Sequence, residues 1–538
     1  MSNIHDLIKT DLNFITKEPI NLCQTKDYKF GHYCFSNNKN DFSKIKNFNS
    51  IQKIEKVGRY NNIFVQKEKL TINLLTNILK NNSNYGNNFS NKTLVIDFSS
   101  PNIAKAFGLG QLRTTIIGNS LANIYEKNGW KVVRLNYLGD WGTQFGKLMC
   151  AYSIKGNKIE LEKNPIEYLQ SLYVWINKNM TPELENESRV WFKKLEDSDK
   201  EALKLWGIFK KYSLFELNKV YDLFGISFDV ISSESEYKDA CAKVWKKLLL
   251  LGLLKESEGA LIVDLKKYDL GVAILKKVDG ATSYISRDIA AAIDRKERFC
   301  FDKMIYEVGQ EQQLHFKQLI KILELMDYDW SKNITHVWHG LYLGADGTKL
   351  STRVGTSGKA LGIWNDISNE VIKNFYADKK ITKELKNKVN IITKAILFFF
   401  DLKSNRLHDT KLDIKSISEA KGDTGSFILY NFVRAKSILR DKTISLPILV
   451  NEVSDTEFEL IQYFDEFSDL VNKAMIENEP SLIANYSLKI THLFSSLYAE
   501  KKFIGSDKEK YYIALTNCFI IIQKECMNLL GMETLEEM

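Results

Sequence analysis

The sequence lacks the features that mark secreted, zinc-bound or membrane-spanning proteins. Its 538 residues include only seven cysteines, which are scattered, with no CxxC pair and no zinc-like spacing to histidine. The N-terminus has no apolar core of the kind found in signal peptides, and the apolar run from Ala395 to Leu402 is too short and too closely flanked by charge to cross a bilayer. These absences predict a cytoplasmic protein with reduced thiols, no resident metal and no membrane association.

Proline and histidine are also scarce. Proline occurs six times, and together with the abundance of Asn, Lys and Ile this indicates the codon bias of an A+T-rich genome, so isolated Asn clusters carry little functional weight. Histidine occurs seven times, and none lies between His32 and His315. A site within that interval therefore has no histidine from the same part of the chain.

The balance of charge is mild. Lys and Arg number 75 against 67 Asp and Glu, which gives a formal net charge of +8. Such a charge permits a polyanionic partner but suits an ordinary basic protein equally well. A hydrophobic content of 44% over this length predicts several packed domains rather than one.

One stretch has the layout of a nucleotide site. The runs Thr93–Phe98 and Lys131–Leu135 are rich in apolar and β-branched residues, and a segment with helical periodicity lies between them, ending near Gly129. Two strands joined through a helix predict a right-handed βαβ unit. The loop 99–110 is then expected at the carboxyl edge of a parallel sheet and at a helix N-terminus, where backbone N–H groups suit a phosphate.

The remaining chain divides by pattern. Residues 1–90 mix helical periodicity with an Asn/Ser-rich stretch, and 147–255 is largely helical, as an insertion in a split nucleotide-binding fold would be. The α/β pattern resumes with Ala260–Leu265, a helix-prone segment and the strand Lys303–Gly309. After about Lys373 the sequence is expected to be helical to its end, which suggests a separate α-helical domain.

Several segments together resemble one family. They are SSPNIAK, LRTTIIG, NYLGDWGTQFG, YISRDIAAAIDR, GQEQQLHF, GTKLSTRVGT, KGDTGSFILYNFVRAKSILR and NLLGMETLEEM. In order and separation they resemble the class I arginyl-tRNA synthetases, with spacing closest to the fungal and other eukaryotic cytosolic forms. The resemblance covers nearly the whole chain.

That resemblance implies an α/β fold with three domains. It implies an α+β N-terminal tRNA-binding domain over 1–90, a Rossmann-like parallel-sheet catalytic domain over 91–365 with a helical insertion at about 150–255, and an α-helical anticodon-binding domain over 366–538. The implied activity is ATP-dependent activation of L-arginine and its transfer to tRNA(Arg), with Mg²⁺, by a monomer.

The resemblance also assigns residues to catalysis and to ATP. The family's HxGH signature is replaced here by Gly108, Leu109, Gly110 and Gln111, in which Gln111 keeps a side-chain N–H donor. Its second signature loop supplies cations and a hydroxyl, although a lone Lys/Arg loop is otherwise solvated surface. The catalytic candidates are Lys105, Gly108, Gly110, Gln111, Lys349, Ser351 and Arg353. The ATP candidates are Gly108, Gly110, Gln111, His315, Lys349 and Leu350.

Arginine recognition needs carboxylate or amide oxygens for the guanidinium group. By motif match the candidates are Asp97, Ser100, Asn102, Tyr284, Asp288 and Gln312. Without the resemblance, N-capping of the helix is the favoured role of Asp288. A lone histidine such as His315 or His339 is more often a structural residue than a ligand contact.

Two regions are expected to contact tRNA. In the N-terminal region Tyr60 and Phe64 are candidates for phosphate contact and base stacking, or for core packing. In the helical C-terminal region Tyr430, Arg434 and Met538 match base-contacting positions of the family.

The missing histidines leave an alternative open. Loss of a preorganised donor typically lowers a rate ~10²–10³-fold, so the chain could be a catalytically weakened paralogue that binds arginine or tRNA. A third reading is another class I nucleotidyl-transferring enzyme, which the presence of the C-terminal helical region opposes.

Overall fold

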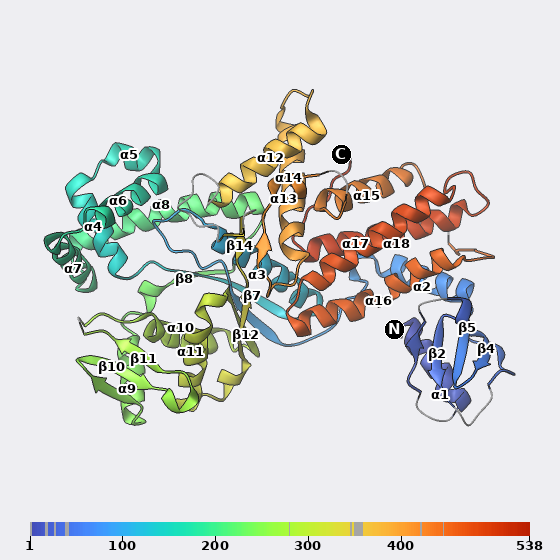
Figure 1. The fold of residues 1–538 in the computed structure, drawn as a ribbon, viewed down its shortest axis with the longest axis horizontal. Coiled ribbons are helices and arrows are strands. Elements are labelled where there is room, and N and C mark those ends of the chain that lie inside the picture. The colour runs from blue at the N-terminus through green and yellow to red at the C-terminus, as the bar shows by residue number, and fades with distance from the viewer. Residues whose placement is uncertain are drawn as a thin grey trace. The chain divides into compact units, whose positions relative to one another are not determined.

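The chain folds into two units in the computed structural model (Figure 1). The structure describes residues 3–16, 20–25, 28–37, 42–278, 280–344, 347–348, 359–419, 422–444 and 446–538. One unit holds residues 89–420 with 478–481, and the other holds 1–88, 421–477 and 482–538. The three-domain division expected from the sequence stays a prediction.

A five-stranded parallel sheet lies at the centre of the larger unit. Its strands run in the order β13-β12-β6-β7-β8. Their bounds are β6 Thr93–Asp97, β7 Lys131–Leu138, β8 Val230–Ser233, β12 Lys303–Gly309 and β13 Ile334–His339. The chain builds outward from β6 on one side and then on the other, so the strand order reverses between β6 and β12. Ligands of such sheets bind in the crevice at the carboxyl ends of the strands beside that reversal.

The strand β6 is central because its sequence suits burial on both faces. Leu94, Val95 and Ile96 are fully buried, as expected for a continuous apolar run in a parallel sheet. Helix α3 (Leu109–Lys127) follows β6 and packs closely on it: a Cβ added to Gly118 would lie 2.4 Å from the Phe98 side chain. The predicted βαβ unit and the α/β fold class are confirmed.

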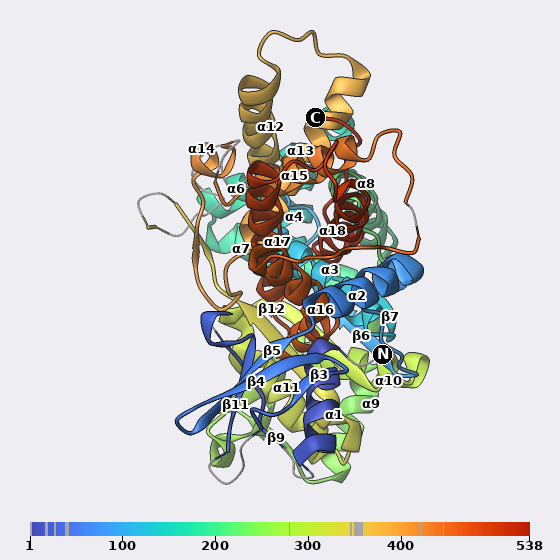
Figure 2. The ribbon, with the colours of Figure 1, turned by 90° about the vertical axis from the view of Figure 1, so that its right-hand side faces the viewer.

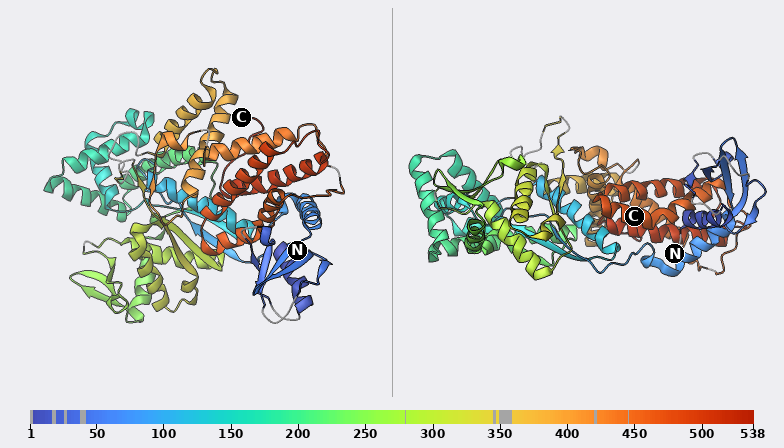
Figure 3. Two further views of the ribbon diagram at one scale, coloured as in Figure 1. Left: turned by 45° about the vertical axis from the view of Figure 1, so that its right-hand side comes forward. Right: turned by 90° about the horizontal axis from the view of Figure 1, so that it is seen from below.

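The insertion is helical but also contributes a strand to the sheet. Between β7 and β8 the chain forms a group of helices, drawn in teal to green in Figure 3. They are α4 Thr143–Lys155, α5 Lys158–Lys163, α6 Pro165–Lys178, α7 Pro182–Glu196 and α8 Lys200–Phe224. The stretch 147–255, expected to be largely helical, thus also contains β8, which completes the parallel sheet.

A second sheet interrupts the α/β pattern. The strands β9 (Leu254–Ser257), β10 (Ala260–Asp264) and β11 (Val272–Lys276) form an antiparallel sheet of their own. The run Ala260–Leu265, expected to resume the α/β pattern, therefore lies outside the parallel sheet. Helices α9 (Cys241–Leu250) and α10 (Tyr284–Phe299) flank this small sheet in sequence.

The larger unit ends in further helices. They are α11 Gln313–Leu325, α12 Ala360–Tyr376, α13 Lys383–Leu402 and α14 Ile414–Ile417. A short parallel pair, β14 (Tyr342–Leu343) with β15 (Thr410–Lys411), interrupts the stretch that was expected to be helical throughout. The apolar run 395–402 is buried inside α13. Across the described part of the chain, no helix combines the length and apolarity needed to cross a membrane.

The smaller unit is built from the N-terminal and the C-terminal parts of the chain (Figure 2). The N-terminal part is an antiparallel sheet of order β1-β2-β5-β4-β3 with two helices. Its bounds are α1 Ile4–Thr16, β1 Cys23–Gln24, β2 Tyr33–Ser36, β3 Lys46–Phe48, β4 Ile51–Val57, β5 Tyr60–Val65 and α2 Lys67–Asn81. The C-terminal part is α15 Gly425–Ile438, α16 Asp455–Glu477, α17 Ser481–Glu500 and α18 Glu509–Leu529.

Polar contacts fix the N-terminal segment on α16. Asp465 accepts a hydrogen bond from the Ile4 backbone N–H at 2.6 Å, and the Tyr85 hydroxyl donates to the Phe464 carbonyl at 3.0 Å. Burial raises the pKa of Asp465 to about 7. The segment before β1 is therefore held by a partly desolvated carboxyl group.

Candidate active site

The loop after β6 has an unusual backbone. Ser99, Ser100 and Ala104 have φ values of +71°, +41° and +60°, a region that non-glycine residues occupy at a cost of about 1–3 kcal/mol each. Hydrogen bonds to α8 hold the loop: the Ser99 and Tyr221 hydroxyls lie 2.8 Å apart, and the Ala104 N–H donates to the Ser213 hydroxyl at 2.8 Å. Two anchors on one helix therefore fix this segment at the carboxyl edge of the sheet.

Asn102 is placed against the end of β7. It forms a parallel bridge with Gly139, and the backbones of Ile103 and Pro101 bond to Gly139 on either side. A Cβ added to Gly139 would lie 2.2 Å from the Asn102 Oδ1 atom. Glycine at position 139 therefore leaves the space that the Asn102 side chain occupies.

Asp97 is buried at the end of β6 and is paired inside the protein. Its Oδ2 lies 2.9 Å from Arg295 Nη1 of α10, and its Oδ1 accepts a hydrogen bond from Ser100 at 2.7 Å. Burial raises the pKa of Asp97, and the charge of Arg295 and the Ser100 hydrogen bond partly oppose this rise. Both carboxylate oxygens thus hold neighbouring residues of the site.

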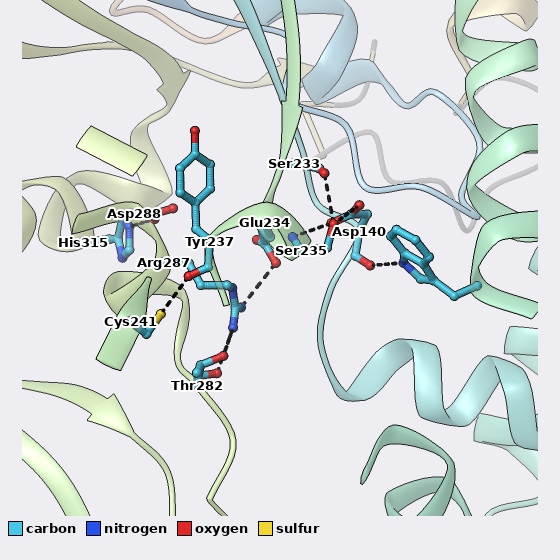
Figure 4. Close-up of polar contacts among 11 residues, drawn as sticks. Asp140, Ser233, Glu234, Ser235, Tyr237, Cys241, Thr282, Arg287, Asp288 and His315 are labelled. Atoms are coloured by element: carbon cyan, nitrogen blue, oxygen red, sulfur yellow. Dashed lines mark hydrogen bonds and ion pairs between the residues drawn. The ribbon is translucent and has the colours of Figure 1, made fainter. Parts of the chain in front are cut away.

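Glu234 follows β8 and lies near two other carboxyl groups, those of Asp288 and Asp140 (Figure 4). We call these three residues the acidic wall. It is 8% exposed, and its Oε2 lies 3.3 Å from Arg287 Nη2. Burial raises the pKa of Glu234 to about 8; Arg287 opposes the rise, and the nearby Asp288 and Asp140 add to it. A carboxyl group that is costly to ionise in the protein alone would be stabilised in its charged form by an incoming cation.

Asp140 holds the segment that carries Glu234. This fully buried carboxylate pairs with Lys210 at 2.7 Å and accepts from the Ser235 N–H at 2.9 Å and from its hydroxyl at 2.8 Å. The Asp140 carbonyl accepts from the Trp206 indole at 2.9 Å. The ends of β7 and β8 and helix α8 are thereby joined.

Asp288 lies inside α10, and its Oδ2 lies 2.7 Å from His315 Nε2 of α11 (Figure 4). Burial lowers the pKa of His315, but the hydrogen bond and charge of Asp288 outweigh it and raise that pKa overall. Since Ser283 is the N-cap residue of α10, the capping role considered for Asp288 is excluded. Tyr284 at the helix start is 51% exposed, and Gln312, just after β12, is also exposed.

The first turn of α3 is open at Gly110, whereas Gly108 and Leu109 are buried. Gly108 is its N-cap residue, and its N–H donates to Gln111 Oε1 at 3.1 Å. A Cβ added to Gly110 would meet no atom within 4 Å. Backbone N–H groups at such a helix start suit an anion.

Lys105 is exposed, with Nζ 5.4 Å from the Tyr173 ring centre.

The second signature loop lies outside the described residues. This applies to Lys349, Leu350, Ser351 and Arg353, whose predicted roles stay predictions.

His339 is buried at the end of β13, with Nδ1 2.7 Å from Glu307 Oε1, as a structural histidine would be.

The tRNA candidates differ in exposure. Tyr60 is 42% exposed, whereas Phe64 is half-buried with Lys53 Nζ 4.3 Å above its ring. Tyr430 and Arg434 lie one turn apart on α15; Tyr430 is 50% exposed, and the guanidinium carbon of Arg434 lies 4.4 Å from the Tyr498 ring centre. Met538 is half-buried. Their roles toward tRNA stay predictions.

Sequence reasoning missed the residues that hold the site together. Glu234, Arg287 and Arg295 did not stand out in the sequence. Glu234 directly follows β8, and a polar residue after an apolar run is the signal that could have found it. The two arginines lie in a helix whose charges are otherwise typical of a solvated face.

Comparisons with known proteins show the family of the chain. The family model for tRNA synthetases class I (R), catalytic domain, matches residues 74–414, and that for the DALR anticodon binding domain matches 428–538. The arginine–tRNA ligase of Ligilactobacillus salivarius is 40% identical over 501 residues, covering 91% of this chain and 88% of that protein. The arginine–tRNA ligase of Streptococcus suis is 39% identical over 499 residues with the same coverage.

Solved structures share the fold. Thermus thermophilus arginyl-tRNA synthetase has a TM-score of 0.80 at 17% identity, covering 99% of both chains. The enzyme from Plasmodium falciparum has a TM-score of 0.76 at 23% identity, covering 100% of both. The fold is that of a class I synthetase, and the chain belongs to the arginyl-tRNA synthetase family of that class. The expected likeness to fungal and eukaryotic cytosolic forms is wrong, because the relatives at 37–40% identity are bacterial.

Gly139→Ala is expected to disable the site by moving Asn102. The new Cβ would lie only 2.2 Å from Asn102 Oδ1 and so displace it, and a displacement of about 1 Å in a positioning residue can lower turnover ~10²-fold. We expect weaker L-arginine binding by calorimetry with an intact fold by circular dichroism. In an Asn102→Ala background Gly139→Ala should add little, and an equal further loss there would contradict this role.

Proposed function

We propose that the protein is an arginine–tRNA ligase. It uses ATP to convert L-arginine to arginyl-adenylate and then transfers the arginyl group to the 3′ end of tRNA(Arg). This proposal rests on one observation. The acidic wall and the first turn of α3, which is open at Gly110, lie at the same edge of the parallel sheet. The first suits a guanidinium cation and the second suits a phosphate.

Arginine would be held from two sides. Glu234 and Asp288 supply carboxylate oxygens for the guanidinium group, beside the exposed ring of Tyr284. Ser100, Asn102 and Gln312 supply polar groups for the α-amino and α-carboxylate groups. Asp97 acts through Ser100, which it holds at 2.7 Å, and adds negative charge near the α-amino group.

The activation step is a displacement at phosphorus. An oxygen of the arginine carboxylate attacks the α-phosphorus of ATP, the bond to the bridging oxygen breaks, and pyrophosphate leaves with the electron pair. Gly110 leaves open space at the first turn of α3, Gly108 is proposed to approach phosphate through its backbone, and Gln111 Nε2 supplies a donor. Lys105, with Lys349, Ser351, Arg353 and Leu350 of the second signature, is proposed to stabilise the leaving group and ATP. His315 is proposed to contact adenosine.

Mg²⁺ is proposed to enter with ATP rather than as a resident ion. In the part of the chain that the structure describes, no group of three His, Cys, Asp or Glu side chains is arranged to hold a metal. In the transfer step the 3′-terminal ribose hydroxyl of tRNA attacks the arginyl carbonyl. The bond from that carbonyl to the phosphate oxygen breaks, AMP leaves with its electron pair, and the hydroxyl proton is released.

The partner and domain assignments complete the proposal. Tyr430, Arg434 and Met538 are proposed to contact the anticodon, and Tyr60 and Phe64 the body of tRNA(Arg). The division into domains 1–90, 91–365 and 366–538, the monomeric state and the cytoplasmic location are proposed from the family resemblance and composition. A weakened paralogue that only binds its ligands is not favoured, because the 40% identical relative is a ligase.

Aminoacylation tests the proposal. Purified protein is incubated with total tRNA, ATP and labelled arginine, with labelled lysine and glutamine as controls. We expect ATP-dependent label on tRNA with arginine alone. Absence of charging alongside retained tRNA binding would contradict the proposal in favour of the non-catalytic alternative.

Arginine affinity should rise with pH between 6 and 8. Glu234 has a pKa of about 8, so below that pH it must release a proton to accept the guanidinium group, and affinity should fall by up to about tenfold per pH unit. Calorimetry at pH 7 in buffers of different ionisation enthalpy should detect this proton release. Glu234→Gln should bind arginine more weakly and lose most of the slope, the remainder belonging to His315. A flat wild-type profile would exclude this role.

Gln111→Glu should separate catalysis from helix capping. Glutamate keeps the oxygen that accepts the Gly108 N–H but removes the amide donor and adds negative charge near phosphate. We expect an unchanged melting temperature and a kcat lower by ~10²–10³-fold in aminoacylation. Gln111→Ala, which loses the cap, should be slow and also less stable. Full activity of Gln111→Glu would show that Gln111 donates nothing to ATP.

A further inference from the structure

Two cysteines lie opposite each other on neighbouring strands of the N-terminal sheet. Cys23 of β1 and Cys34 of β2 are direct partners in the antiparallel register, and both are free thiols. Directly opposed residues point their side chains to the same face, with Cα atoms about 4.5–5.5 Å apart. A disulfide needs Cα atoms about 4.4–6.8 Å apart. The backbone of this pair therefore already has the spacing of a disulfide.

The two thiols differ in reactivity. Cys23 is exposed, whereas Cys34 is half-buried. Burial raises the pKa of the Cys34 thiol, and the neighbouring Cys23 adds to the rise. Because the thiolate is the nucleophile in thiol oxidation, we expect Cys23 to react first and Cys34 to close the bond.

The cysteine pair lies on the outer face of the sheet. The residues on either side of Cys34 are buried in the core, so Cys34 itself points to the opposite face. Its partner across β5 is Asn62, and Tyr60 and Phe64, two positions away on that strand, share this face. The thiols thus lie on the same surface as two residues proposed to contact tRNA.

The hairpin between the two cysteines is held on α16. The hydroxyl of Tyr28 donates to Gln462 Oε1, and Gln462 Nε2 donates to the Tyr33 hydroxyl at 3.2 Å. A disulfide brings two Cβ atoms to about 3.8 Å, which is closer than the ~4.5–5.5 Å at which opposed strand residues stand. Since α16 holds the hairpin, we expect β2 to absorb this closure by twisting against β5.

We propose that Cys23 and Cys34 form a reversible disulfide when the protein meets a hydroperoxide, and that the disulfide weakens tRNA binding. The proposal rests on the proposed function for the contacts of Tyr60 and Phe64 with tRNA. Disulfides of cytosolic proteins are usually transient, and those that are strained or exposed are the readily reduced, regulatory ones. The reduced form is the one that binds tRNA at full strength.

The hydroperoxide is the oxidant in this step. The Cys23 thiolate attacks its terminal oxygen, so that an S–O bond forms and the O–O bond breaks, and water or an alcohol leaves after taking up a proton. The Cys34 thiolate then attacks the Cys23 sulfur, the S–S bond forms, and the sulfenic oxygen leaves as water. The two electrons that the thiols lose reduce the hydroperoxide. A dithiol reverses the bond by exchange and is itself oxidised.

The first test maps the bond in the full-length protein. Reduced protein is treated with hydrogen peroxide, digested without reductant and analysed by mass spectrometry. We expect a linked peptide that contains Cys23 and Cys34 and that dithiothreitol separates. In Cys34→Ser, Cys23 should instead be trapped as a sulfenic acid by dimedone.

The second test measures tRNA binding. The oxidised wild type should bind a tRNA(Arg) transcript about fivefold more weakly than the reduced protein, which is the loss expected when one stacked base is released. Dithiothreitol should restore the affinity, and neither Cys23→Ser nor Cys34→Ser should respond to peroxide. Melting temperatures of the reduced variants check the fold.

Cys300→Ser is the matched control. Cys300 is also exposed but lies between α10 and β12, in the other unit of the chain. This variant should form the linked peptide and lose tRNA affinity on oxidation as the wild type does.

Three results would overturn the proposal. The linked peptide could be absent at a peroxide concentration that already oxidises Cys300, or the linked protein could bind tRNA with unchanged affinity. Cys34→Ser could also lose affinity as the wild type does, which would place the effect at another side chain. Because the bond is mapped without tRNA, failure of the reduced protein to charge tRNA with arginine would reject the proposed function separately.

Discussion

The buried ion pair between Asp97 and Arg295 is the contact on which the site depends. It joins the end of β6 to α10, so one interaction sets the position of the loop with Ser100 and of the helix with Tyr284 and Asp288. Taking both charges out of water carries a desolvation penalty that their attraction can fail to exceed. The pair is therefore better understood as a device that fixes geometry than as a source of stability. Without it a buried carboxylate would be left beside the acidic wall.

The acidic wall is a second place where carboxyl groups are taken out of water. Glu234, Asp288 and Asp140 approach one another in a partly desolvated region, and Arg287 and Lys210 compensate only some of their charge. Near neutral pH the protein alone therefore keeps Glu234 largely protonated. A cationic ligand stabilises the ionised form of this carboxyl group, which favours a guanidinium group over neutral side chains of similar size.

The sequence was informative where burial and pattern coincide. The strands β6, β7 and β12 were predictable because runs such as Val95 and Ile96 are covered on both faces. Strand β8 was not, since it is short, ends in serine and follows a long helix. The roles of Arg287 and Arg295 could not be predicted either, because a charged residue inside a helix is usually solvated and only tertiary packing turns it inward. Motif resemblance identified Asp288 and Asn102, but not the bond to His315 or the glycine that makes room for Asn102.

The anchoring of the post-β6 loop on α8 has a consequence for domain exchange. The helices α4 to α8 leave the sheet at the end of β7 and return to it at the neighbouring β8, so we expect that this group could be exchanged between relatives as one cassette. A transplanted cassette must nevertheless carry equivalents of Ser213 and Tyr221, since these two side chains hold the strained segment around Ser99 and Ala104. Chimeras that preserve only the sheet junctions would release that segment, whereas chimeras that also graft this helix face would keep it.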